Sequence, residues 1–419
     1  QYNTSRFKSV HLKEFVFTTV DNNIFTVGGF KGKNTIPQKN ISWVVTEEGV
    51  VVIDTGNKKT AIVARQKIRE MTDKPIKYII YTHHHGTQVA GASILKDPET
   101  KIIAHEDLVA EFDLYKKFYR YNARRDFIQF NLPFDFNEVK PHDFIYPDIT
   151  YETEYRFTLG ETTFELYHVV GEAPDYTVIF LPGQKVVWSA DLTGGMPLVA
   201  SPMKRVRNEV KWKNGLEFIK SLKPEILIQS VQPPFCDQTL IVKKLDSMID
   251  YFDFLHESIA REMNNNSTLE ETLHSIKLPA DMKTNPLLQE RYGSLQFNLR
   301  GLYHRYSGWF DQNGTHLNRA SSKEREQSLI EDMGGDEKVL QQSRELEQHK
   351  NYKLALEYLD LLISAETKLK DAHQAKSEIL MEMSKHYKHQ ITINIYKRLA
   401  NMERNKAAEI AKEGKNEER

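Results

Sequence analysis

The chain changes character near residue 240, and this change constrains its fold more than any other feature. Before it, short runs rich in β-branched residues alternate with stretches of helical periodicity. After it, no run predicts a strand, and residues 323–415 are rich in Glu, Lys, Gln, Leu and Ala at helical spacing. The sequence therefore predicts an α/β domain followed by an all-α region.

The first part contains strand pairs that are joined by turn signals. Residues 41–46 and 50–53 flank a Glu-Glu-Gly turn, which predicts a β-hairpin. Residues 59–72 carry apolar side chains at helical spacing, and residues 76–81 form a buried strand. A second β-rich stretch over residues 153–189 predicts further hairpins. A histidine cluster follows the strand that ends at residue 81.

Composition and charge exclude several classes of protein. The 57 Lys and Arg residues balance 58 Asp and Glu residues, so the basic surplus that non-specific nucleic-acid binding needs is absent. No apolar run reaches the ~18 residues of a membrane span. Cys236 is the only cysteine, so a metal site must use His, Asp and Glu.

The chain begins at Gln1 rather than Met, which fits removal of a secretory signal. We therefore expect a periplasmic or secreted location, with a cytoplasmic location as the alternative.

The histidine cluster is the strongest candidate for chemistry. His83 and His85 follow the buried strand at spacing i, i+2. In an extended segment alternate side chains lie on one side, so both imidazoles can face one ion, while His84 points away. Neutral imidazole is a common ligand of zinc, iron and manganese. Spacing alone leaves open a polar loop that is merely rich in histidine.

The order of motifs around this cluster resembles the metallo-β-lactamase superfamily. The matching pieces are Val52–Gly56, Tyr81–His85 and the small-residue segment Val89–Ala92. The superfamily motif is H-x-H-x-D-H, and here Thr87 stands at the Asp position and Gln88 at the final His position. The resemblance implies an α/β fold of the αββα sandwich type.

Other motifs resemble the alkylsulfatase branch of that superfamily. Glu172 follows a glycine where most members carry His, and Asp191 follows a strand at the position of a bridging carboxylate. On their own, the first suits a turn and the second a helix cap. Residues 291–294 and 303–311 resemble the family segments R-G-x-Y-G and Y-x-x-Y-x-G-W-Y-D. The resemblance implies that the helical region serves as a dimerisation domain.

The same resemblance implies the ligand set. The second ion of the family would need an Asp-His pair at Thr87 and Gln88 and a later His near residues 228–233, where none occurs. A hydroxyl and an amide are poor substitutes for these ligands. We therefore predict one divalent ion, zinc first, with iron or manganese as alternatives. Its predicted ligands are His83, His85, Glu172 and Asp191.

The resemblance also implies roles for neighbouring residues. Asp54 is expected to orient the histidine loop, and Gln88 to act as a weak ligand or to hold a water molecule. Phe297 stands where the family has a His that assists the leaving group, so general-acid help worth about 10²–10⁴ in rate is lost. His168 is interpreted as a core histidine.

The resemblance to alkylsulfatases further implies an arginine between Asp191 and the next helix that binds the sulfate group, for which a guanidinium is suited. A solvated charge cluster is the equal alternative for this segment. The predicted substrate-binding residues are Arg205, Arg207, Asn298 and Tyr303.

These observations predict a domain organisation and a function. Residues 1–240 form the metal-binding domain, 241–322 a linking segment that completes the active-site pocket, and 323–419 a helical domain that forms a homodimer. The predicted function is hydrolysis of a small ester, a sulfate ester by resemblance, by one ion that activates water. Two alternatives stay open: a non-hydrolytic metal- or ligand-binding homologue, and a changed single-metal reaction such as a lyase or an iron-dependent oxidation.

Overall fold

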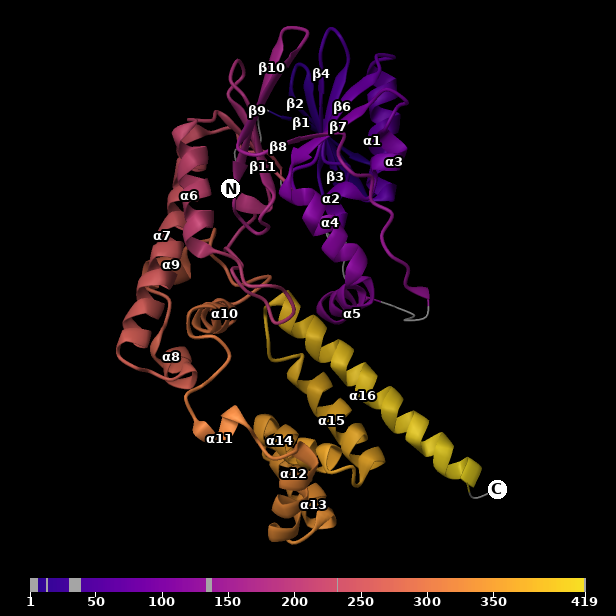
Figure 1. Ribbon diagram of the computed structural model, residues 1–419, viewed down its shortest axis with the longest axis vertical. Coiled ribbons are helices and arrows are strands. Elements are labelled where there is room, and N and C mark those ends of the chain that lie inside the picture. Colours follow the sequence, from indigo (N-terminus) through magenta and orange to yellow (C-terminus); the bar gives the residue numbers. More distant parts are fainter. Residues whose placement is uncertain (1–6, 13, 30–38, 133–137, 232, 418–419) are drawn as a thin grey trace. The chain divides into compact units, whose positions relative to one another are not determined.

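The computed structural model describes residues 7–12, 14–29, 39–132, 138–231 and 233–417 (Figure 1). The chain divides into two compact units. The sandwich unit comprises residues 1–122, 138–289 and 295–305, and the helical unit comprises residues 123–137, 290–294 and 306–419.

Two β-sheets form the centre of the sandwich unit. The eight-stranded sheet has the order β1 to β8, antiparallel from β1 to β5 and parallel from β5 to β8. The five-stranded sheet has the order β13-β12-β11-β10-β9, in which only β13 pairs in parallel. The strands are β1 (Lys8–Leu12), β2 (Phe15–Asp21), β3 (Ile24–Gly29), β4 (Ile41–Val45), β5 (Val50–Ile53), β6 (Ile76–Ile80), β7 (Lys101–His105), β8 (Ile149–Tyr151), β9 (Glu154–Leu159), β10 (Thr162–Val169), β11 (Tyr176–Leu181), β12 (Val186–Ala190) and β13 (Ile226–Gln229).

Helices cover the outer face of each sheet (Figure 1). Helix α1 buries Ala61, Ala64 and Ile68 against the eight-stranded sheet, which is the apolar face that its sequence spacing predicts. Helices α6 and α7 pack on the five-stranded sheet. The helices of this unit are α1 (Lys58–Met71), α2 (Gly86–Val89), α3 (Ala92–Leu95), α4 (Asp107–Lys117), α6 (Glu209–Ser221), α7 (Gln238–Asn264), α8 (Leu269–Ser275), α9 (Ala280–Thr284) and most of α10 (Leu295–Ser307). Helix α5 (Tyr119–Phe130) begins in this unit and ends in the helical unit.

Three apolar layers hold the sandwich together. Trp43 and Ile79 lie in the layer beneath α1, and Phe164 and Ile228 lie in the layer between the two sheets. Trp212 of α6 belongs to the third layer, between the five-stranded sheet and its helices. This helix-sheet-sheet-helix order confirms the predicted αββα sandwich. The sequence pattern did not predict strands β1, β2 and β8.

The helical unit has its own core. Its apolar residues include Val339, Leu359, Ala372 and Ile379, which lie on faces that repeat at helical spacing. Its helices are α11 (Gly314–Leu317), α12 (Ser322–Asp332), α13 (Asp336–Gln348), α14 (Tyr352–Ser364), α15 (Leu369–Met383) and α16 (Gln390–Glu417). Among the described residues beyond 240 there is no strand, which confirms the predicted all-α region.

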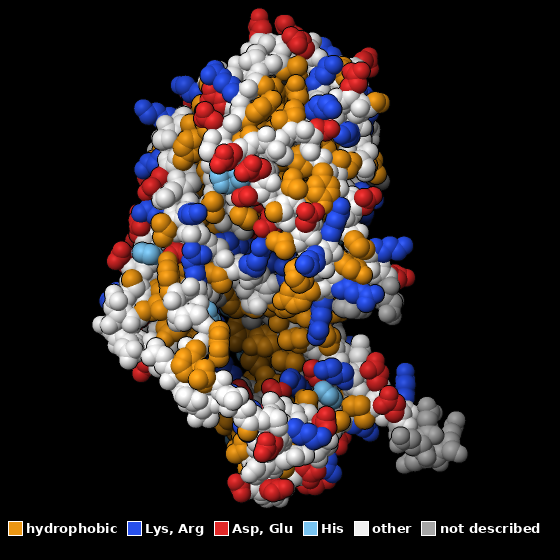
Figure 2. Space-filling model, in the orientation of Figure 1, with side chains coloured by type: hydrophobic (Ala, Val, Ile, Leu, Met, Phe, Trp, Pro, Cys, Tyr) orange, Lys and Arg blue, Asp and Glu red, His pale blue; other side chains and the backbone are white. Residues whose placement is uncertain are grey.

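Surface charge matches the balanced composition. Lys and Arg side chains are interspersed with Asp and Glu over the face in view (Figure 2). Within the described residues, no helix has the length and apolar character that crossing a membrane requires.

A buried lysine in α7 gives a prediction about stability. Lys244 is 1% exposed, and its ammonium lies 5.2 Å from the centre of the Phe235 ring. Burial lowers the pKa of Lys244 to about 8. Because the unfolded chain keeps this proton to higher pH, Lys244→Met is expected to raise the free energy of unfolding at pH 7 by about 2 kcal/mol.

The gain should shrink as pH rises from about 8 to 10.5, where the unfolded lysine also becomes neutral. Urea denaturation at pH 7 and pH 10 measures both effects. Lys243→Met changes the exposed neighbour on α7 and serves as the control. A destabilised Lys244→Met variant at pH 7 would show that the ammonium contributes more than its burial costs.

Candidate metal site

The histidine loop lies between β6 and α2 and is anchored at both ends by the segment after β5. Asp54 accepts hydrogen bonds from the backbone N–H and the hydroxyl of Thr82, at 2.8 and 2.7 Å. Thr55 donates twice to the carbonyl of Gln88, and Gly91 donates to the carbonyl of Gly56. The Asp-Thr-Gly motif therefore fixes the loop from residue 82 to residue 91.

Asp54 occupies an unusual environment for a carboxyl group. Its backbone has φ of +56°, a strained value for a residue other than glycine. Burial raises the pKa of Asp54 to about 7, against the opposing effect of the two hydrogen bonds from Thr82. The Asp54 side chain contacts the histidine loop through Thr82.

Three predicted ligands come together. One atom each of His83, His85 and Asp191 lies within 4.8 Å of the others. His83 Nε2 is 2.9 Å from His85 Nδ1 and 3.6 Å from Asp191 Oδ2. The His83 ring stacks on Tyr176, with ring centres 4.3 Å apart, and the Tyr176 hydroxyl accepts from the Asp191 backbone N–H. We call His83, His85 and Asp191 the three-donor group.

Asp191 reaches this position through a sharp bend. It begins the short 3₁₀-helix η2 (Asp191–Thr193), directly after β12. The preceding Ala190 has φ of +46°, a conformation that side chains with a Cβ rarely adopt. The bend places the carboxylate of the five-stranded sheet opposite the histidines of the eight-stranded sheet.

Burial and neighbouring charges together set the protonation states of the three donors. It lowers the pKa of His83 to about 3 and that of His85 well below its usual value. Burial opposes the charge of Asp191, but Lys39 and His83 outweigh it and hold the pKa of that carboxyl below its usual value. Two neutral imidazoles and a carboxylate are the forms that bind metal ions. The donor set fits a divalent metal ion, for which imidazole and carboxylate are suitable ligands.

Glu172, the fourth predicted ligand, points to a different partner. Its carboxylate pairs with the guanidinium of Arg207 at 2.7 Å, and it lies outside the three-donor group. Arg207 is 7% exposed and also donates to the carbonyl of Leu198 at 2.8 Å. Arg207 therefore positions Glu172 and the chain before α6.

The other predicted substrate-binding residues are dispersed. Arg205 pairs with the buried carboxylate of Glu111 while most of its own side chain is exposed. Asn298 is fully buried and bonds to the backbone of Ala200 and Pro197, and the Tyr303 hydroxyl donates to the carbonyl of Ser267. In the described structure Asn298 and Tyr303 hold the fold of α10 rather than face the three-donor group.

The two positions expected to serve a second ion carry the neutral side chains of Thr87 and Gln88. The Thr87 hydroxyl donates to the side-chain oxygen of Gln88 at 2.6 Å. The Gln88 amide nitrogen donates to Asp191 at 3.1 Å and to the Ser230 hydroxyl at 3.3 Å. The ammonium of Lys39 lies 2.6 Å from the other oxygen of Asp191. Sequence reasoning missed Lys39, because no local motif marks a lysine that pairs over 152 positions.

His84 turns away from the three-donor group into a buried pair of carboxylates. Its backbone N–H and its ring Nδ1 contact Asp175 at 2.8 and 2.7 Å, and its Nε2 lies 3.5 Å from Glu111. The predicted direction of His84 is therefore observed. Sequence reasoning gave no role to Asp175 or Glu111, which are distant from it in the chain.

A second group of possible donors lies at the ends of β7 and β10. His168 stacks on His105 with ring centres 3.6 Å apart and an interplanar angle of 15°, and Asp107 lies close by. Imidazole lone pairs lie in the ring plane, so two stacked rings do not converge on one ion. His105 also contacts the carbonyl of Glu152 at 2.7 Å. The packing suits a structural histidine at position 168.

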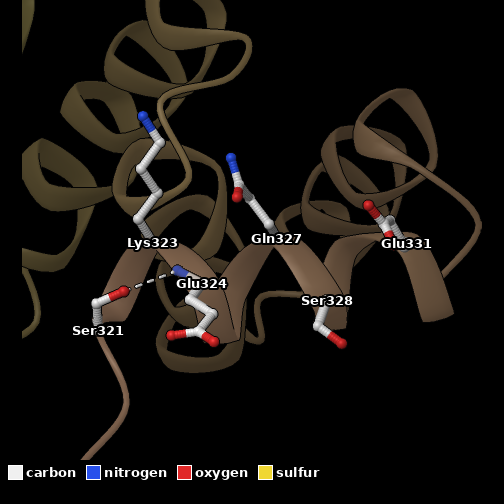
Figure 3. Close-up of a pocket in the computed structure, with 6 residues that line it drawn as sticks. All are labelled: Ser321, Lys323, Glu324, Gln327, Ser328 and Glu331. Carbon is white, nitrogen blue, oxygen red and sulfur yellow. Dashed lines mark hydrogen bonds between the residues drawn. The ribbon is translucent and has the colours of Figure 1, made fainter.

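Two hollows among the described residues differ in their surroundings. One of about 10 Å³, room for about one water molecule, lies between the sheets beside Asp54, Thr82 and Ser230. A larger depression of about 400 Å³ lies on α12 in the helical unit, where six polar or charged side chains line it (Figure 3). These side chains spread along one helix, and the Ser321 hydroxyl caps it by accepting from the Glu324 backbone N–H. Their spread gives no convergent binding site.

Comparison with known families agrees with this architecture. Residues 35–230 match the family model of the metallo-beta-lactamase superfamily. Residues 268–406 match the model described as alkyl sulfatase dimerisation. Residues 35–230 are therefore a domain of the metallo-β-lactamase type, followed by a region of the alkylsulfatase dimerisation type. This combination of two domains in one chain is similar to that of alkylsulfatases.

Individual relatives carry the same names. The chain is 27% identical over 322 residues to a linear primary-alkylsulfatase of Pseudomonas sp., covering 70% of this chain and 60% of the relative. It is 26% identical over 392 residues to the alkyl/aryl-sulfatase BDS1 of Saccharomyces cerevisiae, covering 85% and 58%. The chain thus spans about 60% of the length of these curated relatives.

A solved structure shares the fold over most of the chain. The stereoselective inverting sec-alkylsulfatase Pisa1 of Pseudomonas sp. superposes with a TM-score of 0.79 at 24% identity. The match covers 92% of this chain and 65% of that one.

Proposed function

We propose that this chain is a metal-dependent hydrolase of small sulfate esters that works with one divalent ion. The three-donor group carries the proposal, since two neutral imidazoles and a carboxylate converge on one point at the strand ends. The relatives are named alkylsulfatases, which supports a sulfate ester as the substrate. Zinc is the proposed ion, ahead of iron or manganese.

The ion and the side chains of the site would have separate roles in the reaction. A divalent ion held here would supply Lewis acidity and a water of lowered pKa. His83 and His85 present lone pairs in a fixed direction, and Asp191 contributes the negative charge. Asp54 keeps the loop in place through Thr82. Arg205, whose side chain is 65% exposed, remains the proposed contact for the sulfate group.

We propose Glu172 as a fourth ligand. When the ion binds, the carboxylate of Glu172 would leave Arg207 and contact the ion. Glu172→Gln keeps the shape and removes the charge. If Glu172 is a ligand, the substitution should weaken metal affinity at least about tenfold. Loss of a residue that only hydrogen-bonds to a ligand already has an effect of about this size. Unchanged affinity would restrict the protein ligands to the three-donor group.

The test is a joint measurement of metal content and turnover. The protein is loaded separately with zinc, manganese and iron(II), and sulfate release from medium-chain alkyl sulfates is measured. We expect about one metal equivalent per chain and turnover that His83→Ala abolishes. His274→Ala, on the exposed face of α8, is the control.

The outcomes separate the remaining functions. One equivalent of metal without turnover of any alkyl sulfate would favour a non-hydrolytic binding homologue. Bound iron with a redox-linked spectrum would favour a changed reaction. Two equivalents in the unaltered chain would refute the single-ion proposal.

We also propose a homodimer formed through the helical region, which matches the dimerisation model over residues 268–406. Sedimentation of the full chain at several concentrations tests it, and a monomer at all concentrations would overturn it.

A further inference from the structure

Asp191 directs its two oxygens toward different partners. Oδ2 faces His83 at 3.6 Å and accepts from the Gln88 amide at 3.1 Å. Oδ1 accepts from the ammonium of Lys39 at 2.6 Å. One oxygen therefore belongs to the three-donor group, and the other is already neutralised by a charge of the chain itself.

The Lys39–Asp191 pair is shielded from water. The side chain of Lys39 is 16% exposed and that of Asp191 is 9% exposed. An ion pair in such a place is screened far less than a surface pair. Removing one member leaves the other charge without compensation, so the two side chains depend on each other.

The chain holds Lys39 in position through its neighbour. The Asn40 backbone N–H donates to the carbonyl of Ser230, and its side-chain amide donates to the carbonyl of Gln229 at 2.6 Å. The Asn40 side chain also lies directly over Gly28 of β3, where an added Cβ would come within 1.9 Å of its oxygen. These contacts attach Lys39 to the end of β13, beside the site.

The two groups that donate to the oxygens of Asp191 are unsuited to binding a cation. The amide of Gln88 and the ammonium of Lys39 both point N–H donors at the carboxylate. The side-chain oxygen of Gln88 is occupied by the Thr87 hydroxyl. A metal ion here would meet hydrogen-bond donors in place of lone pairs, next to a like charge.

We propose that Lys39 is a positioning residue that supplies the second positive charge of the site as a fixed part of the chain, and thereby excludes a second metal ion. The inference rests on the proposed function only for the ion in the three-donor group. Lys39 neutralises one oxygen of Asp191 and turns the other toward His83.

The experiment rebuilds the missing ligands with and without the ammonium. The background variant carries Thr87→Asp, Gln88→His and Ser230→His, which place acceptors around Asp191. Metal equivalents per chain are measured by elemental analysis after dialysis against zinc. We expect the background variant to hold one equivalent, and the same variant with Lys39→Met to hold two.

A charge-retaining variant separates electrostatics from shape. Lys39→Arg in the same background keeps the positive charge and is expected to hold one equivalent. Lys96→Met breaks a half-buried Lys–Asp pair with Asp148 elsewhere in the same unit and is the matched control, also with one equivalent. A merely structural role for Lys39 would give the same stoichiometry for Arg and Met.

A single substitution gives a second test that does not depend on whether the background variant folds. Lys39→Glu in the unaltered chain sets a second carboxylate beside Asp191, and we expect it to hold two equivalents when circular dichroism shows it folded. Two equivalents in the background variant with Lys39 intact would overturn the inference, as would one equivalent in both the Lys39→Met and Lys39→Glu variants. No metal in the unaltered chain would instead refute the proposed function.

Discussion

Asp191→Asn is expected to lower both metal affinity and alkyl sulfate hydrolysis by at least about 10²-fold, because a metal ion contributes several kcal/mol to such reactions. Asp191 is the only anion of the three-donor group. An amide oxygen keeps the shape but is a weaker ligand. The substitution also leaves the ammonium of Lys39 facing a neutral group at close range.

Metal content after dialysis and the rate of sulfate release measure the two effects. Asp148→Asn changes another aspartate that pairs with a lysine and should leave both unchanged. An Asp191→Asn protein that retains metal but loses turnover would assign the carboxylate to chemistry rather than to binding. Retention of both would remove Asp191 from the site.

Asp175→Ala is expected to give the largest loss of stability, about 3 kcal/mol in the free energy of unfolding. Asp175 is fully buried, and its carboxylate satisfies both the backbone N–H and the ring of His84. Removing it leaves both groups unsatisfied and leaves His84 beside Glu111 alone.

The effect should depend on pH. Burial opposes the charge of Asp175, but the contacts with His84 outweigh it and hold the pKa of this carboxyl below its usual 3.8. A lowered carboxyl pKa stabilises the fold above the unfolded value, and this stabilisation is lost as pH falls. The gap between wild type and variant should therefore be full at pH 7 and narrow below about pH 4.

Urea denaturation at these pH values gives the measurement, and Asp73→Ala, at an exposed position after α1, provides the comparison. Equal stabilities of the Asp175→Ala variant and wild type at pH 7 would show that His84 finds other partners.

Local pattern predicted most of the sandwich, because several of its strands are short, apolar and fully buried. Val50–Ile53 is an uninterrupted β-branched run, and helix α1 follows with a clear apolar face. The strands β1 and β2 escaped prediction because β1 is mostly exposed and β2 is only half-buried, so neither has a strong apolar pattern. The pairing of β1 with β2, and of β2 with β3, comes from the sheet rather than from the residues of these two strands.

The site was predictable only where a motif marks it. The spacing of His83 and His85 after a strand indicated a shared ion, and the resemblance to alkylsulfatases added Asp191 to the predicted ligands. Lys39 is 152 positions from its partner Asp191, and Asp175 is 91 positions from its partner His84, and no spacing rule covers such pairs. The pairing of Glu172 with Arg207 likewise depends on the fold, which brings together two residues 35 positions apart in the chain.

The histidine loop also connects the two sheets through hydrogen bonds of its backbone. The backbone N–H of Thr82 donates to a carboxylate after β5, that of His84 to a carboxylate before β11, and the Thr82 carbonyl accepts from the backbone of Thr177 in β11. Amide hydrogens held by buried side chains cannot exchange with solvent through fraying of a strand; they need the layers to part. The rate of deuterium uptake at residues 82 and 84 would therefore measure how readily the two sheets separate. Exchange at this short segment would thus report the stability of the whole sandwich.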